Sequence, residues 1–215
     1  MIQKLFPTLT YQTFLHGGDF PSSAAKKKCL NLNRSLLEEV ESFKRVDKAG
    51  QEWSKKNYLG GYTSYASYDR LFLVSSEFDN LRKALTPHVG KFIKALDMDI
   101  SINDLEMTHL WMNVMPSNVT HSMHIHPLSV ISGTYYLQVP KGSGSLKIED
   151  PRMDQFMNSP ARKANAKLEN QRHVHLRPQA GQLILFESWT RHEVPPNLGQ
   201  GIRISISFNY GWKNR

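Results

Sequence analysis

The sequence contains a single cysteine, Cys29, among its 215 residues. One thiolate can complete neither an internal disulfide nor a zinc site made of several cysteines, so both are excluded. There is also no run of about 18 apolar residues that could form a membrane-spanning helix. Residues 1–12 lack the apolar stretch of a secretory signal. From these absences we expect a cytoplasmic protein without a membrane anchor.

Basic residues are not concentrated in any tail, although the net charge is +8. Residues 1–100 and 101–215 each carry +4. The densest basic run, Lys26 to Lys28, has no interleaved aromatic residues on which bases could stack. We therefore expect a solvated basic surface. A nucleic-acid-binding module is the least favoured of three function classes, and it would require binding to polyanions that depends steeply on salt.

The length and the hydrophobic content of 40% predict one domain, residues 1–215, with one buried core. A change in hydrophobic period near residue 104 divides it into a helical support region, 1–103, and a β-rich core, 104–213. In the first part we expect a helix that begins near Asn33 or Ser35, and a second helix over 76–96 that Pro87 could kink. The Gly- and Tyr-rich residues between them predict a loop or short strands.

Beyond residue 104 the apolar residues alternate with a period of two, as they do in strands. Six such segments are expected, at 105–115, 130–140, 144–150, 173–178, 181–187 and 202–212. Short strands separated by Gly and Pro predict a barrel or a two-sheet jelly roll. In the last segment Ile204 and Phe208 face one side, and Arg203 and Ser205 face the other. The polar residues 152–171 suit a mobile flap or a passive surface excursion.

Three of the nine histidines lie in the stretch HSMHIHP, residues 121–127. On a strand, His124 and His126 project from the same face, as two ligands of one metal ion must. The spacing alone is not specific, because His173 and His175 repeat it. His121 lies three positions before His124 and faces the opposite way on a regular strand, unless a loop reorients it.

The order of the segments that follow carries a resemblance to a known superfamily. After HIH come GTYYLQV, GSGSLKIEDPR, GQLILFESW and then RHEVP, and Arg203 lies eleven residues after His192. This order resembles that of the Fe(II)- and 2-oxoglutarate-dependent oxygenases, particularly the prolyl hydroxylases. More narrowly, GYTSYAS near residue 61, together with HIHPLSVISGTYYLQVP and RISISFNY, resembles a bacterial and phage family of oxygenases without a defined substrate. The resemblance spans about residues 60–212.

The resemblance implies a fold and an activity. The fold would be mainly β with N-terminal helices, around a double-stranded β-helix of the jelly-roll, cupin-like type. The enzyme would consume dioxygen, decarboxylate 2-oxoglutarate to succinate, and oxidise, usually by hydroxylation, a primary substrate that the sequence does not identify. The oligomeric state is also open, a homodimer included.

The resemblance also assigns roles to individual residues. His124 matches the proximal iron ligand and His192 the distal one. Arg203 matches the partner of the far carboxylate of 2-oxoglutarate, which a planar guanidinium can hold with two parallel hydrogen bonds. Three further candidates for cosubstrate binding are Ser205, Tyr136 and, more weakly, Asn113.

The sequence departs from the superfamily pattern at His126, where an Asp or Glu is usual. A neutral imidazole leaves the charge of an iron(II) centre at +2, whereas a carboxylate lowers it to +1. Three arrangements are open: a catalytic site of three histidines, two histidines with water or halide in the third position, or a carboxylate from Glu149 or Asp150. We favour three histidines, because the spacing requires no further assumption.

An alternative function shares the predicted fold: a cupin-like three-histidine metal protein that does not use 2-oxoglutarate. The direction of Arg203 and Ser205 distinguishes the two, because a dicarboxylate cosubstrate requires both to face the metal pocket. Trp111 and Trp189 are expected in the core or the pocket wall. A neighbouring carboxylate, Glu187 or Glu193, could orient His192 but is more often solvated.

Overall fold

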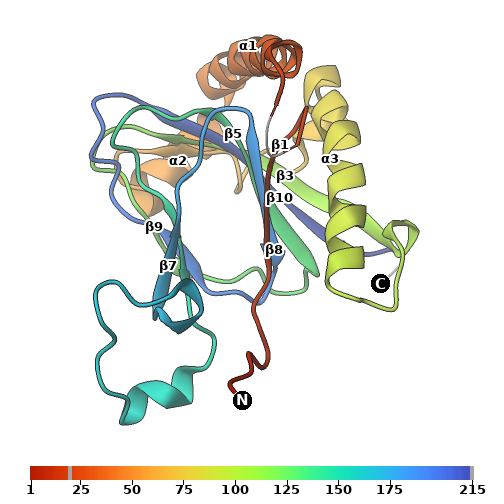
Figure 1. The fold of residues 1–215 in the computed structure, drawn as a ribbon. Coiled ribbons are helices and arrows are strands. Elements are labelled where there is room, and N and C mark those ends of the chain that lie inside the picture. The colour runs from red at the N-terminus through yellow and green to blue at the C-terminus, as the bar shows by residue number, and fades with distance from the viewer. Residues whose placement is uncertain (19–20, 214–215) are drawn as a thin grey trace.

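Residues 1–18 and 21–213 are described by a computed structural model, drawn in Figure 1. Within these ranges the chain forms two antiparallel sheets and three α-helices. The six-stranded sheet has the order β1-β8-β5-β10-β3-β2 and the four-stranded sheet the order β4-β9-β6-β7. The strands of the first are β1 (Thr10–Phe14), β8 (Gln182–Glu187), β5 (Ile131–Gln138), β10 (Arg203–Trp212), β3 (Leu105–Met115) and β2 (Tyr62–Thr63). Those of the second are β4 (His121–His124), β9 (His192–Val194), β6 (Leu146–Glu149) and β7 (His173–Leu176).

Each of the six predicted strand segments contains a strand, and β10 has the predicted alternation. Its apolar side chains Ile204, Ile206 and Phe208 belong to the main hydrophobic core, while Arg203 and Ser205 line a pocket on the other face. The outermost strand β1 was not predicted. The division into a support region and a β core stays a prediction, since β1 and β2 come from the first 103 residues.

The three helices are α1 (Ser23–Val46), α2 (Lys48–Asn57) and α3 (Ser76–Ala95). The predicted start of the first helix is wrong, because Ser22 is the N-cap and Asn33 lies buried within the helix. Asn33 instead accepts a hydrogen bond from the hydroxyl of Tyr135 at 2.6 Å. The first helical turns carry few buried side chains, so the apolar period there is weak. α3 has the predicted extent and continues through Pro87.

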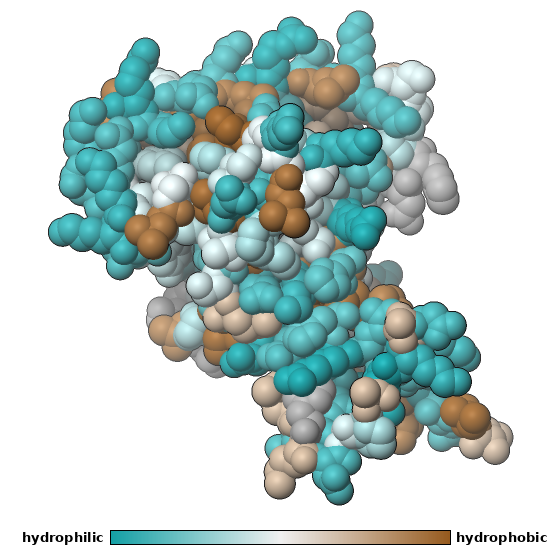
Figure 2. Space-filling model, turned by 90° about the vertical axis from the view of Figure 1, so that its left-hand side faces the viewer, coloured by the Kyte–Doolittle hydropathy of each residue, from teal (hydrophilic) through white to brown (hydrophobic). Residues whose placement is uncertain are grey.

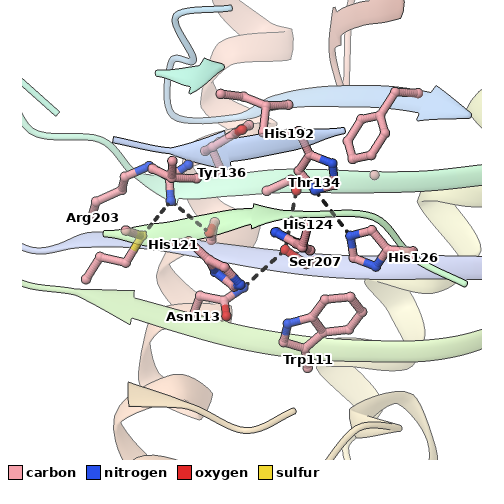
Figure 3. Close-up of a pocket in the computed structure, with 16 residues that line it drawn as sticks. Trp111, Asn113, His121, His124, His126, Thr134, Tyr136, His192, Arg203 and Ser207 are labelled. Carbon is pink, nitrogen blue, oxygen red and sulfur yellow. Dashed lines mark hydrogen bonds between the residues drawn. The ribbon is translucent and has the colours of Figure 1, made fainter. Parts of the chain in front are cut away.

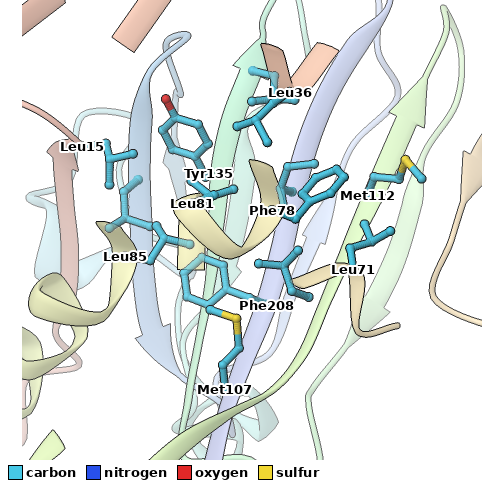
Figure 4. Packing of buried hydrophobic residues seen from close by; sticks show 14 of the residues in the cluster. Leu15, Leu36, Leu71, Phe78, Leu81, Leu85, Met107, Met112, Tyr135 and Phe208 are labelled. Atoms are coloured by element: carbon cyan, nitrogen blue, oxygen red, sulfur yellow. The ribbon is translucent and has the colours of Figure 1, made fainter. Parts of the chain in front are cut away.

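The main core lies between the six-stranded sheet and the helices α1 and α3, which cover its outer face (Figures 1 and 4). From α3, Phe78, Leu81 and Leu85 are fully buried and belong to the same cluster as Phe208 of β10. Each such side chain contributes about 1.5–3 kcal/mol relative to an exposed one. A second apolar cluster lies between the two sheets. The core therefore packs against the apolar face of β10, and the polar face of this strand is directed toward the second sheet.

Strand register brings distant polar residues together on that face. Ser205 of β10 pairs with Asn113 of β3 on one side and with Tyr136 of β5 on the other. Directly paired residues on adjacent strands project from the same face of a sheet. Residues that are up to 92 positions apart in the sequence thereby become neighbours.

The connection between β6 and β7 contains two short 3₁₀ helices, Met153–Met157 and Leu168–Asn170, and projects from the body at the lower left of Figure 1. Its Glu169 forms an ion pair with Lys4 of the N-terminal residues at 3.1 Å. Figure 2 shows a mainly hydrophilic surface on the side of the four-stranded sheet, with separate hydrophobic groups. Whether this excursion moves as a flap stays a prediction. Among the helices of residues 1–18 and 21–213, none has the length and apolarity needed to cross a membrane.

Candidate metal centre and anion pocket

Four of the nine histidines line one pocket between the two sheets (Figure 3). His124, His126 and His192 each offer one ring nitrogen, and these nitrogens lie within 4.8 Å of one another. The Nε2 atoms of His126 and His192 are 3.2 Å apart. Two nitrogen ligands at about 2.1 Å from an octahedral ion are themselves about 3 Å apart when they are adjacent. The spacing of His126 and His192 therefore fits two adjacent ligands of one transition-metal ion.

Backbone carbonyls orient two of these imidazoles. The Nδ1 atom of His124 lies 2.7 Å from the carbonyl oxygen of Ser122, and that of His192 lies 2.8 Å from the carbonyl oxygen of Thr190. Because a carbonyl oxygen only accepts, each Nδ1 must carry the hydrogen and donate it. Each Nε2 then keeps a free lone pair, which is the form that binds a metal.

Electrostatics also keep the cluster neutral. Burial, assisted by the neighbouring imidazoles, lowers the pKa of His126 to about 2 and that of His192 to about 4. Burial likewise lowers the pKa of His124. Neutral imidazoles can bind a cation without first releasing a proton. The donor set therefore fits a metal ion at physiological pH.

The local backbone differs from the regular strand that the sequence predicted. β4 ends at His124, and His126 lies beyond it, with its backbone N–H donating to the carbonyl of Ser188 at 3.0 Å. On β4, His121 pairs with Val194 of β9, and His124 pairs with His192 of β9. Three residues along β4 therefore correspond to two residues along β9. A β-bulge of this kind reverses the alternation. It explains why His121, expected to face away, lines the pocket with its ring 4.6 Å from that of His124.

The carboxylates considered as alternative ligands are engaged elsewhere. Glu149 forms an ion pair with Arg191 at 2.7 Å, and its other carboxylate oxygen lies 3.5 Å from His173 Nε2. Asp150 pairs with Arg152 at 2.8 Å. No Asp or Glu among the described residues lines the pocket. Within that part of the chain, the structure thus brings three histidines together without a carboxylate.

Arg203 provides the one cationic side chain among the described pocket residues, and it is 2% exposed. Its Nη1 donates to Ser205 Oγ at 3.3 Å and contacts the sulfur of Met115 at 3.1 Å. Its guanidinium lies 5.0 Å from the centre of the Tyr136 ring. Within residues 1–18 and 21–213 it forms no ion pair, and its Nε has no hydrogen-bond partner. A buried charge without a counter-ion is costly, so the pocket is suited to an anion.

The other predicted cosubstrate residues line the same pocket, and Tyr136 and Asn113 are labelled in Figure 3. The hydroxyl of Tyr136 and the Oδ1 of Asn113 are buried without a hydrogen-bond partner in the described part of the chain. Asn113 Nδ2 donates to Ser207 Oγ at 3.1 Å. Burial raises the pKa of Tyr136, while Arg203 acts in the opposite direction. The tyrosine therefore keeps its proton and can donate it to an acceptor.

Three neighbouring predictions have different outcomes. Trp111 forms part of the pocket wall, with its ring 5.8 Å from that of His126. Trp189 is 47% exposed, so its predicted place in the core or pocket wall is wrong. Glu193 forms an ion pair with Lys147 at 2.7 Å, and the Thr190 carbonyl is the group that contacts His192 Nδ1.

Solved structures with a similar fold include two proteins from bacteria. A prolyl-4-hydroxylase from Pseudomonas putida is 15% identical, with 96% of this chain and 94% of that chain covered and a TM-score of 0.58. HygX from Streptomyces hygroscopicus, solved with nickel, 2-oxoglutarate and hygromycin B, is 14% identical, with 96% and 84% covered and a TM-score of 0.58. At these identities the likeness shows the fold.

A third similar structure is the epimerase SnoN in complex with Fe3+, alpha ketoglutarate and nogalamycin RO. It is 14% identical, with 84% of this chain and 74% of that chain covered and a TM-score of 0.57. None of the curated proteins matches this chain. Residues 109–209 match the model of a family described as "Putative 2OG-Fe(II) oxygenase". These residues, slightly less than half of the chain, include all three clustered histidines and Arg203, and this part of the chain is similar to that family.

Proposed function

We propose that this protein is an Fe(II)- and 2-oxoglutarate-dependent dioxygenase that hydroxylates a primary substrate still to be identified. The observation that carries the proposal is Arg203, a buried guanidinium without a counter-ion among the described residues, in the same pocket as the three histidines. A diacid bound to the metal at one end would place its second carboxylate against this cation. We further propose that the two sheets form a double-stranded β-helix with the site between them.

Iron would be held by His124, His126 and His192. The Nδ1–H donors fix the rings of His124 and His192, so their Nε2 lone pairs face the ion without rearrangement. Three ligands on one face leave open positions for a cosubstrate and for dioxygen. When bound, iron would supply the activation of dioxygen that is coupled to decarboxylation of 2-oxoglutarate to succinate.

The far carboxylate of 2-oxoglutarate would be held by Arg203, with Ser205, Tyr136 and Asn113 as further contacts. The free Nε of Arg203 and the hydroxyl of Tyr136 are donors without acceptors in the described part of the chain, and a carboxylate provides acceptors for both. Water is largely excluded from this end of the pocket, because Tyr136 is fully buried and Ser205 is 2% exposed. Hydrogen bonds to a charged group are strongest in such a dry environment.

The absence of a carboxylate ligand among the described pocket residues changes the charge of the site. Iron(II) with three neutral imidazoles and Arg203 together carry +3, and the 2-oxoglutarate dianion would reduce this to +1. A carboxylate at position 126 would bring the sum to zero. We therefore expect the dianion to contribute more to the stability of this site than it would in a site with a carboxylate ligand.

Similar structures support the proposal. HygX was solved with nickel and 2-oxoglutarate bound, and SnoN was solved with Fe3+ and alpha ketoglutarate. The competing function, a cupin-like metal protein that does not use 2-oxoglutarate, is less well supported, because both Arg203 and Ser205 line the metal pocket. Cytoplasmic localisation, the lack of nucleic-acid binding and the oligomeric state stay predictions.

The test is consumption of dioxygen and release of succinate by the iron-loaded protein supplied with 2-oxoglutarate. We expect slow turnover even without the primary substrate, and its loss in Arg203→Ala. Binding is measured separately as the rise in melting temperature on addition of Ni²⁺ and 2-oxoglutarate. Wild-type protein that shows neither turnover nor metal-dependent stabilisation by 2-oxoglutarate would refute the proposed function.

A further inference from the structure

A second buried tyrosine, Tyr58, has a hydroxyl group without a partner near the anion pocket. It is 6% exposed, and its hydroxyl has no hydrogen-bond partner among the described residues. An unsatisfied buried hydroxyl is unfavourable, because the group has lost its bonds to water and gained none in return. Such groups are rare in folded proteins, and each calls for an explanation such as a ligand or a water molecule.

Tyr58 comes from outside the residues that match the family model. It is the C-cap of α2, at the start of the sequence YLGGY that leads into β2. Its ring lies 5.4 Å from that of the pocket residue His121, and it belongs to the same apolar cluster as Met115 and Tyr136. Met115 in turn contacts Arg203. The ring thus adjoins the pocket at His121, within the cluster that contains Met115 and Tyr136.

The backbone turn after Tyr58 packs closely against the Tyr58 ring. A Cβ atom at Gly61 would lie 2.7 Å from Tyr58 Cε1, closer than side-chain carbons approach, so only glycine fits there. The backbone N–H of Gly61 donates to the carbonyl of Tyr58 at 3.0 Å, which closes the turn. The position of the ring is therefore fixed by the local backbone.

Electrostatics connect the hydroxyl to Arg203. Burial raises the pKa of Tyr58, and the guanidinium of Arg203 acts in the opposite direction, so the hydroxyl keeps its proton. The neutral hydroxyl can then act as a donor. Within the described part of the chain, three donor groups lack acceptors: Arg203 Nε and Tyr136 OH, from residues that line the pocket, and Tyr58 OH, from a residue beside it. A carboxylate offers about four lone-pair sites in two oxygens, which is enough to satisfy all three.

We propose that Tyr58 donates a hydrogen bond to the same carboxylate that Arg203 and Tyr136 hold. The N-terminal region would then supply a cosubstrate-binding residue as well as structural support. This inference rests on the proposed function, because it takes 2-oxoglutarate as the diacid. The competing explanation is a structural tyrosine whose hydroxyl binds a trapped water molecule.

The experiment compares two ligands that differ at the far carboxylate. Isothermal titration calorimetry on the Ni²⁺-loaded full chain measures the dissociation constants of 2-oxoglutarate and of 2-oxobutyrate, which lacks that carboxylate. For Tyr58→Phe we expect 2-oxoglutarate to bind about tenfold more weakly or worse, the effect of losing one hydrogen bond to a charged group. Binding of 2-oxobutyrate should stay within about twofold of wild type, since its contacts are all at the metal end.

The matched control is Tyr135→Phe. Tyr135 is also buried, but its hydroxyl donates to Asn33 on the opposite face of the sheet. This variant should lower the melting temperature and leave the affinity for both acids unchanged. Should Tyr58→Phe fold poorly, Gly61→Ala displaces the ring and gives a second variant, for which the same loss specific to 2-oxoglutarate is expected.

The outcomes separate the two proposals. If Tyr58→Phe binds 2-oxoglutarate as wild type does, or loses affinity for both acids equally, Tyr58 is structural and the inference is overturned while the proposed function stands. If the wild-type protein does not bind 2-oxoglutarate at all, the proposed function itself fails and the inference falls with it.

Discussion

Replacing Arg203 with methionine should separate the cost of a buried charge from its value in binding. In the ligand-free protein the guanidinium has no carboxylate partner among the described residues and is 2% exposed. Replacement of buried ionic groups by apolar ones of similar size is often neutral or stabilising, by about 1–4 kcal/mol. The contact with the Tyr136 ring, at 5.0 Å, would be lost and is worth about 2 kcal/mol when desolvated. We therefore expect Arg203→Met to change the free energy of unfolding of the ligand-free protein by about −2 to +2 kcal/mol.

With the cosubstrate bound, the charge becomes favourable. Truncating one member of a buried, hydrogen-bonded charge pair costs about 2–5 kcal/mol, which corresponds to a loss of 2-oxoglutarate affinity of roughly 30-fold to several thousand-fold. At a concentration of 100 times the wild-type dissociation constant, 2-oxoglutarate stabilises the wild-type protein by about 2.7 kcal/mol. At the same concentration, 2-oxoglutarate should raise the free energy of unfolding of the variant by less than about 1 kcal/mol. With the ligand present, wild type should therefore be more stable relative to the variant than without it.

The assay is urea unfolding of both proteins, with and without Ni²⁺ and 2-oxoglutarate. The m-value must be equal in the two proteins for the comparison to be valid. The expectation fails if Arg203→Met lowers the free energy of unfolding of the ligand-free protein by more than about 2 kcal/mol and 2-oxoglutarate still stabilises it as it does wild type. That result would mean that Arg203 is a structural residue with partners in the fold, and not an empty anion site.

Three other perturbations test the site and the fold. His126→Ala should abolish the stabilisation by Ni²⁺, whereas His175→Ala, which changes the other HxH pair, should leave it intact; thermal melting measures both. Arg152 holds the pKa of Asp150 below its usual value, so Asp150→Asn should lower the free energy of unfolding at pH 7. The difference from wild type should shrink as the pH falls below about 4, and urea unfolding at several pH values measures it. Gly133→Ala would place a Cβ 2.5 Å from Phe208 Cζ, and we expect a loss of about 1–3 kcal/mol in the same unfolding assay.

Each of these has a contrary result. Equal Ni²⁺ responses in the two histidine variants would remove the metal centre from the proposal. A deficit of Asp150→Asn that persists unchanged at about pH 2 would show that the carboxylate acts through packing and not through its charge. If Gly133→Ala is as stable as wild type, the sheet around β5 must shift to accommodate the added Cβ.

The strands could be predicted from the sequence because period-two alternation is a local property. β10 shows this, since its apolar and polar faces follow directly from the order of its residues. The start of α1 could not be predicted, because its first turns bury few side chains and its cap, Ser22, is directly followed by a second serine, Ser23. The outermost strand β1 was missed for the same reason, because Thr13 is its one buried residue.

The site shows a similar limit. The order of His124, His192 and Arg203 is visible in the sequence and predicts the members of the pocket. The place of His121 is not, because it depends on the pairing of β4 with β9, which no local pattern records. Tyr58 is harder still to predict, since only the folded chain brings the end of α2 beside the pocket residue His121.

Both outermost positions of the six-stranded sheet are taken by strands from the N-terminal region, β1 beside β8 and β2 beside β3. A fragment cut near residue 104 would leave the backbone groups of β8 and β3 without these partners, and exposed strands of this kind are templates for aggregation. Expression of the β-rich part alone should therefore yield insoluble assemblies rather than a smaller working enzyme.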